Sequence, residues 1–99
     1  MSLSTHVLNA ATGRPAAGLL VRLAAADGTV LAEHRTDDDG RVEDLPAPAA
    51  GVHRLTFETG DISPFYPSVS IDFTIADPAE HHHVPLLLSP YSYSTYRGS

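Results

Sequence analysis

The clearest pattern in the sequence is an alternation of apolar and polar side chains over residues 68–75. The apolar set is Val69, Ile71, Phe73 and Ile75, and the polar set is Ser68, Ser70, Asp72 and Thr74. A repeat of two residues places successive side chains on opposite faces of a β-strand, with one face against a core. No window of useful length shows the 3.6-residue repeat of an amphipathic helix. The sequence therefore predicts an all-β chain.

Shorter strand-like segments recur along the chain with turn residues between them, which is the pattern of a β-sandwich. Besides residues 68–75, we expect strands at residues 5–10, 19–25, 29–35, 41–45, 53–58, 81–88 and 91–96. Asp27-Gly28 is a strong hairpin signal between two of these segments. Pro85 has no N–H group to donate to a neighbouring strand, so we expect a break in the pairing there.

The apolar positions of these segments predict the core. The expected core side chains are Leu8, Val21, Leu23, Val30, Leu55, Phe57, Val69, Ile71, Phe73, Leu86 and Leu88. Burying each large side chain contributes about 1.5–3 kcal/mol before the cost of ordering the chain. A chain of 99 residues is the size of one domain, so we expect residues 1–99 to fold together.

Composition excludes several classes of function. The chain has no cysteine, which excludes disulfides, thiolate metal sites and thiol nucleophiles. It has no lysine and a net charge of −6, which disfavours binding to nucleic acid or to an anionic membrane. The N-terminal residues lack the features of a secretory signal, and the last three residues do not form the peroxisomal tripeptide. We therefore expect a cytoplasmic protein without a membrane span.

The run His81-His82-His83 is the first candidate for chemistry. On a strand, His81 and His83 share one face and His82 points to the other. The ordinary interpretation is a polar entrance to a strand. A metal site is disfavoured, because few other imidazoles remain to complete it. A catalytic imidazole is the alternative, because histidine titrates near neutral pH.

The acidic run at residues 37–40 resembles a calcium loop only superficially. An EF-hand frame ending in Gly40 needs metal ligands where the chain has Arg35 and Pro46, so we expect a solvated turn. Arg41, directly after this turn, is either a surface ion pair or a clamp for an anion or carbonyl group. His6 on the first strand is more often structural than functional. These residues alone do not name a substrate.

Two segments together resemble the signature sequences of the transthyretin family. They are Thr5-His6-Val7-Leu8-Asn9 with Gly13-Arg14-Pro15-Ala16, and the whole stretch from His83 to Ser99. Asp39-Gly40-Arg41 and Phe65-Tyr66-Pro67 also fit in the family's order. The resemblance covers nearly the whole chain.

The family has two main branches, the hormone carrier transthyretin and the enzyme 5-hydroxyisourate hydrolase. His6, Arg41, His83 and the ending Tyr96-Arg97-Gly98-Ser99 resemble the enzyme branch. The resemblance implies hydrolysis of 5-hydroxyisourate in urate degradation, with a small-ligand carrier as the alternative. It implies that His6, Arg41 and His83 are catalytic and that no metal or organic cofactor is needed. It also implies that Tyr96, Arg97, Gly98 and Ser99 bind substrate, with Ser99 offering its hydroxyl or a terminal carboxylate.

The resemblance further implies an eight-stranded sandwich of two sheets, with the first strand, the strand after the Asp-Gly turn and the last two strands in one sheet. Four such chains would assemble as a dimer of dimers, with active sites where the dimers meet. Two departures are visible. The stretch from Glu58 to Phe65 leaves no room for the short helix that the family usually carries, and His82 stands where the family often has tyrosine. We expect neither to disturb the site. Which histidine acts as the base stays open.

Overall fold

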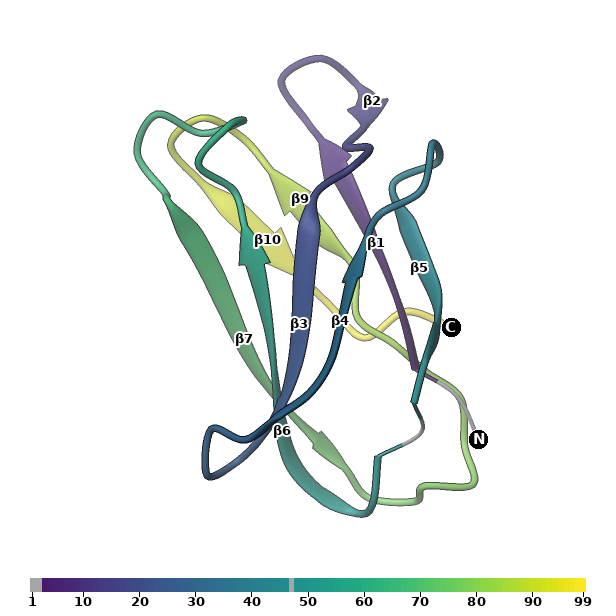
Figure 1. The fold of residues 1–99 in the computed structure, drawn as a ribbon. Coiled ribbons are helices and arrows are strands. Elements are labelled where there is room, and N and C mark those ends of the chain that lie inside the picture. Colours follow the sequence, from purple (N-terminus) through teal and green to yellow (C-terminus); the bar gives the residue numbers. More distant parts are fainter. Residues whose placement is uncertain (1–2, 47) are drawn as a thin grey trace.

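The computed structural model describes residues 3–46 and 48–99 and shows two β-sheets packed face to face, without a helix in that part of the chain (Figure 1). The larger sheet contains β1 (Leu3–Asn9), β2 (Arg14–Pro15), β5 (Arg41–Leu45), β8 (His82–His83), β9 (Leu86–Leu88) and β10 (Tyr93–Thr95). The smaller sheet has the order β4 (Val30–Arg35), β3 (Leu20–Ala25), β6 (Gly51–Glu58) and β7 (Ser68–Ile75). The all-β sandwich is confirmed.

The eight expected strands are present, although two irregularities raise the number of segments. The expected histidine strand is divided into β8 and β9 at Val84-Pro85, because proline cannot donate to the ladder. β2 is a two-residue extension that pairs with the end of β1. The described residues contain no helix of the length and hydropathy that a membrane span requires.

The core lies between the two sheets and matches most of the predicted positions. Eight of the expected side chains are buried: Val21, Leu23, Leu55, Phe57, Val69, Ile71, Leu86 and Leu88. Buried apolar side chains that we did not expect include Leu3, Val7, Leu19, Val42, Leu45, Ile75 and Val84. Most of them come from the larger sheet, whose short strands carry little alternation of their own.

Three core predictions need correction. Val30 is 54% exposed, because the pairing of β3 with β4 shifts by one residue between Leu23 and Ala24 and disturbs the alternation there. Leu8 is half-buried, because the inward side of β1 carries Leu3, Thr5 and Val7. Phe73 is also only partly buried, packed against the margin of the core.

The segment after β6 contains a compact turn at the place where the family's helix was expected to be missing. Thr59 starts it, with its carbonyl accepting from the N–H groups of Ile62 and Ser63 and its hydroxyl donating to the carbonyl of Tyr66. The Ser63 hydroxyl then donates to the carbonyl of Pro90 at 2.7 Å. These bonds fix the segment without a helix, as the sequence predicted.

Thr36 holds the chain where it crosses from the smaller sheet to the larger one. Its hydroxyl donates to the carbonyl of Ala16 at 2.5 Å and accepts from the N–H of Leu19 at 2.9 Å. All three residues are buried, and Thr36 is only 4% exposed. The crossing therefore depends on a side chain that supplies polar partners to two backbone groups that water cannot reach.

We predict that Thr36→Val destabilises the protein by about 1–3 kcal/mol for each of the two backbone groups left unpaired. Thr56→Val is the matched control, because Thr56 bonds only to Ser70 on the outer face of the sheet and its loss should cost less than about 0.5 kcal/mol. Urea unfolding at equal protein concentrations measures both. Equal unfolding midpoints for the two variants would contradict the role given to Thr36.

Candidate active site

β1 brings together residues that lie far apart in the sequence. Its antiparallel pairing with β5 places His6 opposite Arg41, and its parallel pairing with β8 places Ser4 opposite His83. All three expected catalytic residues therefore lie on adjacent strands of the larger sheet. Figure 1 shows the C-terminal end of the chain running back toward β5, next to these strands.

The turn before β5 fixes the position of Arg41. The carboxylate of Asp37 accepts from the backbone N–H groups of Asp39 at 2.9 Å and Arg41 at 3.0 Å, so the acidic run is a turn, as predicted. Gly40 adopts a φ of 74°, and a Cβ there would lie 2.5 Å from the carbonyl oxygen of Val7. Glycine is thus required for the close approach of this turn to β1.

The guanidinium of Arg41 is exposed and is not part of any ion pair within residues 3–46 and 48–99. The carboxylate of Asp37 is directed at backbone N–H groups instead. The interpretation as a surface ion pair is therefore wrong in this structure. An arginine without an anionic partner suits the alternative, a clamp for an oxygen-rich ligand.

Arg41 and His83 line a pocket of about 430 Å³ with Ser99. The remaining lining residues are Ser4, Glu43, Asp44 and His81. Ser4, Glu43 and Asp44 were not expected from the sequence. Side chains two residues apart on a β-strand lie on the same face. This rule could have indicated Ser4, two residues from His6, and Glu43, two residues from Arg41.

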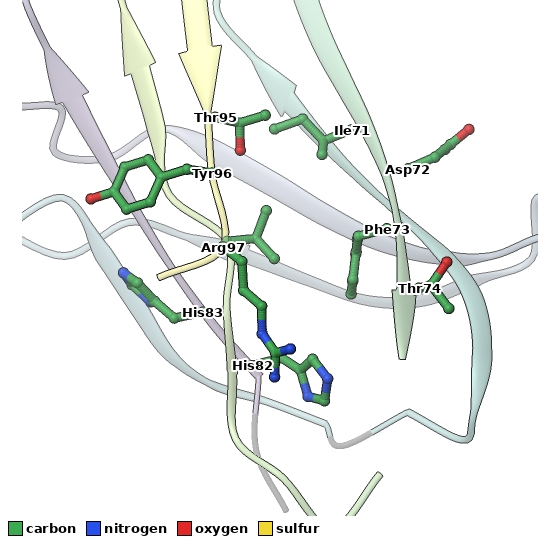
Figure 2. Close-up of a pocket in the computed structure, with 10 residues that line it drawn as sticks. Ile71, Asp72, Phe73, Thr74, His82, His83, Thr95, Tyr96 and Arg97 are labelled. Atoms are coloured by element: carbon green, nitrogen blue, oxygen red, sulfur yellow. The ribbon is translucent and has the colours of Figure 1, made fainter. Parts of the chain in front are cut away.

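A second pocket of about 300 Å³ lies on the other side of His83 (Figure 2). Ile71, Phe73 and Val84 give it apolar walls, and the tail lines it with Tyr96 and Arg97. In Figure 2 the Arg97 side chain extends toward His82, whereas the Tyr96 ring points away from Ile71 and Phe73. The Arg97 guanidinium bonds to Glu80 at 3.0 Å. In the isolated chain, Tyr96 and Arg97 therefore line a different pocket from Arg41, and His83 lines both pockets.

The tail is ordered by backbone pairing rather than by burial. β10 pairs with β9, and Gly98 donates its N–H to the carbonyl of His83 at 2.8 Å. Tyr91 and Tyr96 are nevertheless 71% and 60% exposed in the single chain. A Cβ at Gly98 would overlap the imidazole ring of His83, which explains glycine at this position.

The environment of His83 favours its neutral form. Burial lowers the pKa of His83 below its ordinary value of 6.5, electrostatic interactions with Arg41, His81 and His6 lower it further, and a hydrogen bond with Ser4 acts in the opposite direction. Nδ1 of the ring lies 2.7 Å from the Ser4 hydroxyl. A neutral imidazole beside a guanidinium can accept a proton while the arginine stabilises developing negative charge.

The histidines and carboxylates of residues 3–46 and 48–99 include no group of three or more placed to hold a metal ion. The rings of His82 and His83 point in opposite directions in Figure 2, as the alternation predicted, and His82 does not line the pocket that His81 and His83 share. Nδ1 of His82 lies 3.1 Å from the carbonyl of Glu80. The side chains that line the pocket offer imidazole, guanidinium, hydroxyl and carboxylate groups.

A two-sheet β-sandwich with this pocket on the larger sheet defines a protein of the transthyretin-like class. The chain belongs to the HIUase/Transthyretin family, whose model matches residues 3–98. It is 49% identical over 115 aligned positions to the 5-hydroxyisourate hydrolase of Caulobacter vibrioides, covering 98% of this chain and 97% of the relative. Because the alignment is longer than this chain, the relative carries residues that have no counterpart here.

Two solved structures are similar throughout. The Klebsiella pneumoniae 5-hydroxyisourate hydrolase superimposes with a TM-score of 0.88 and 39% identity, over 99% of this chain and 98% of that one. Sea bream transthyretin in complex with thyroxine gives a TM-score of 0.84 and 32% identity, over 97% and 93% of the two chains. Both branches of the family therefore share this fold.

We predict that Gly98→Ala displaces the His83 ring or detaches the tail from it, because the added methyl group occupies the space of the imidazole. Gly60→Ala is the control, since a Cβ there meets nothing closer than 3.7 Å. Imidazole ¹H–¹³C NMR spectra of the two variants check this. Unchanged His83 resonances in Gly98→Ala would contradict the contact.

We predict that Arg41→Gln raises the pKa of His83 toward 6.5, because it removes a positive charge that opposes the imidazolium. Arg41→Lys keeps the charge and should leave the pKa nearly unchanged. Burial persists in both variants, so the pKa should stay below 6.5 in each. An NMR titration of the histidine resonances measures this, and equal titration of Arg41→Gln and the parent protein would exclude the electrostatic coupling.

Proposed function

We propose that this protein is a 5-hydroxyisourate hydrolase, which converts 5-hydroxyisourate to 2-oxo-4-hydroxy-4-carboxy-5-ureidoimidazoline in urate degradation. The observation that supports this most directly is the pocket that Arg41, His83 and Ser99 share in a chain of this family. Relatives with that name match almost the full length of the chain. Residues 1–99 act as one domain in this proposal.

The reaction adds water across a cyclic C–N bond. In the proposed mechanism, neutral His83 takes a proton from water as the water oxygen joins the carbonyl carbon. Arg41 binds the substrate oxygens and stabilises the oxyanion that develops there. The C–N bond then breaks, and the proton passes from the imidazolium to the leaving nitrogen. His6, opposite Arg41 on β1, orients the substrate.

The tail supplies the remaining walls of the proposed site. Ser99 already lines the pocket with Arg41, and Gly98 packs against His83. Tyr96 and Arg97 would bind substrate once the neighbouring chains narrow the site. Every group in this scheme belongs to the protein, so the proposal includes no metal or organic cofactor. The cytoplasmic location expected from the sequence stays a prediction.

The proposed assembly is a homotetramer built as a dimer of dimers, with the active sites between dimers. β10 and β7 end their sheets and expose unpaired backbone edges, which favour pairing with another chain. Tyr91, Tyr93 and Tyr96 are exposed on or beside β10. Large exposed aromatic side chains at a sheet edge are typical of an interface.

A small-ligand carrier is the second candidate, because transthyretin in complex with thyroxine has the same fold. The side chains of the pocket argue against it. Arg41, Glu43 and Asp44 line it with two histidines, and charged groups disfavour an apolar aromatic ligand. Binding of thyroxine by a protein that lacks hydrolase activity would favour the carrier.

The test is the decay of 5-hydroxyisourate, generated in situ by urate oxidase and followed by ultraviolet absorbance. We predict that fractions eluting as a tetramer accelerate the decay and that His83→Ala reduces the rate by about 10²–10⁴-fold, the usual contribution of general acid–base catalysis. His34→Ala is the matched control, because His34 is exposed on β4 of the other sheet. A tetramer that leaves the spontaneous rate unchanged would rule out the hydrolase.

A further inference from the structure

Ser4 lies between two imidazole rings at the edge of the candidate active site. Its hydroxyl oxygen is 2.7 Å from Nδ1 of His83 and 3.1 Å from Nε2 of His81. Ser4 is 7% exposed, so bulk water does not compete freely for these bonds. The parallel register of β1 and β8, which pairs Ser4 with His83, holds the three side chains together.

The number of protons restricts how this chain of hydrogen bonds can be arranged. A serine hydroxyl donates one hydrogen bond and accepts up to two. Because two imidazole nitrogens contact it, at least one of them must carry a proton and donate to Ser4. Within the described part of the chain, Nε2 of His83 has no hydrogen-bond partner, which leaves it available to a ligand.

Nε2 of His83 keeps a free lone pair only when Nδ1 of the ring carries the proton, and one arrangement of the hydrogen bonds holds the proton there while using the hydroxyl proton of Ser4 as well. Nδ1–H of His83 donates to Ser4, and the Ser4 hydroxyl donates to Nε2 of His81. The opposite arrangement, with Ser4 donating to Nδ1 of His83, places the ring proton on Nε2 and removes the base. Where Ser4 accepts from one ring and donates to the other, the tautomers of His81 and His83 are coupled through its hydroxyl group.

We propose that Ser4 is a positioning residue that, with His81 as its acceptor, holds His83 in the tautomer protonated at Nδ1, with Nε2 facing the substrate. This inference rests on the hydrolase proposed above, although its structural part can be tested without that activity. When Nε2 takes the proton of the attacking water, the Nδ1–H···Oγ bond becomes charge-assisted and stabilises the imidazolium. The hydroxyl then resembles the group that orients the histidine in a catalytic triad.

A neutral orienting group suits this pocket better than a carboxylate. A carboxylate bonded to Nδ1 would favour the imidazolium and raise the pKa of His83, whereas the structure lowers it. The titratable or charged side chains that surround the chain of hydrogen bonds are His6, Arg41, Glu43, Asp44 and His81. Ser4 orients the ring without adding to these charges.

The test measures the tautomer directly, by long-range ¹H–¹⁵N NMR of protein with ¹⁵N-labelled histidine. The signals of His83 are assigned as those that disappear in the His83→Gln variant. We expect Nδ1 to be protonated in the parent protein and in Ser4→Thr, which keeps the hydroxyl. Ser4→Ala should shift the population toward the tautomer protonated at Nε2, and His81→Ala should shift it partly. Protonation at Nε2 in the parent protein, or no change in Ser4→Ala, would overturn the proposal.

Kinetics separate positioning from a general loss of structure. With 5-hydroxyisourate, Ser4→Ala should lose kcat by about 10–100-fold, the range seen when an outer orienting partner is removed, with little change in KM. Ser4→Thr should restore it. Thr5→Val is the control, because the hydroxyl of Thr5, next to Ser4 on β1, donates to the carbonyl of Val84 and not to the ring of His83. Thr5→Val with the same tautomer shift and loss of kcat would overturn the role of Ser4.

The two proposals fail in different ways. If the parent protein does not hydrolyse 5-hydroxyisourate, the proposed function fails, but the NMR measurement still decides whether Ser4 sets the tautomer of His83. If the enzyme is active and Ser4→Ala keeps both its tautomer and its kcat, only the role of Ser4 is lost.

Discussion

The pairing of β1 with strands on both of its sides is the constraint on which the candidate site depends. One side pairs antiparallel with β5 and the other pairs parallel with β8 and β9. The two registers set Arg41 beside His6 and His83 beside Ser4, although these residues come from opposite ends of the chain. The inward side of the same strand contributes Leu3 and Val7 to the core, both fully buried. A one-residue slip of β1 would move its apolar side chains out of the core, so the core itself enforces the geometry of the site.

The site keeps a histidine neutral in a protein whose net charge is −6. The overall charge would favour protonation, but local terms prevail, because burial and the adjacent Arg41 both disfavour the imidazolium. This arrangement has a cost in acid. The pKa of His83 is lower in the folded chain than the ordinary value of 6.5. Between these two pKa values the unfolded chain therefore binds more protons than the folded chain. The contribution of His83 to stability falls as the pH drops through this range. A residue that lowers stability in acid is more readily explained by chemistry than by folding.

The sequence predicted the fold and the members of the site better than it predicted their arrangement. The alternation in β7 and the turn at Asp27-Gly28 are local signals, and both are confirmed. Val30 was misplaced because a register shift is a property of two strands, which one strand's pattern does not contain. Ser4 was missed for a related reason: a serine on a strand is unremarkable until the parallel partner strand places an imidazole beside it. The placement of Tyr96 and Arg41 in different pockets likewise depends on how the tail turns after β10, where no repeat exists to indicate a direction.

The outer face of the smaller sheet carries several charged pairs. Arg22 bonds to Glu33 and Glu58 at 2.8 and 2.6 Å, and Arg54 bonds to Asp72 at 2.7 Å. Exposed pairs of this kind add little stability, but they place charged groups on a face of a sheet that also exposes Val30, Leu31 and Val52. The pairing that places Arg41 and His83 lies within the larger sheet. The two sheets are therefore under different constraints. The smaller sheet needs polar side chains on its outer face and apolar side chains on its inner face, whereas the larger sheet must preserve the register of β1. The connection after β6 joins two strands of the smaller sheet, so shortening it affects that sheet and leaves the register of β1 unchanged.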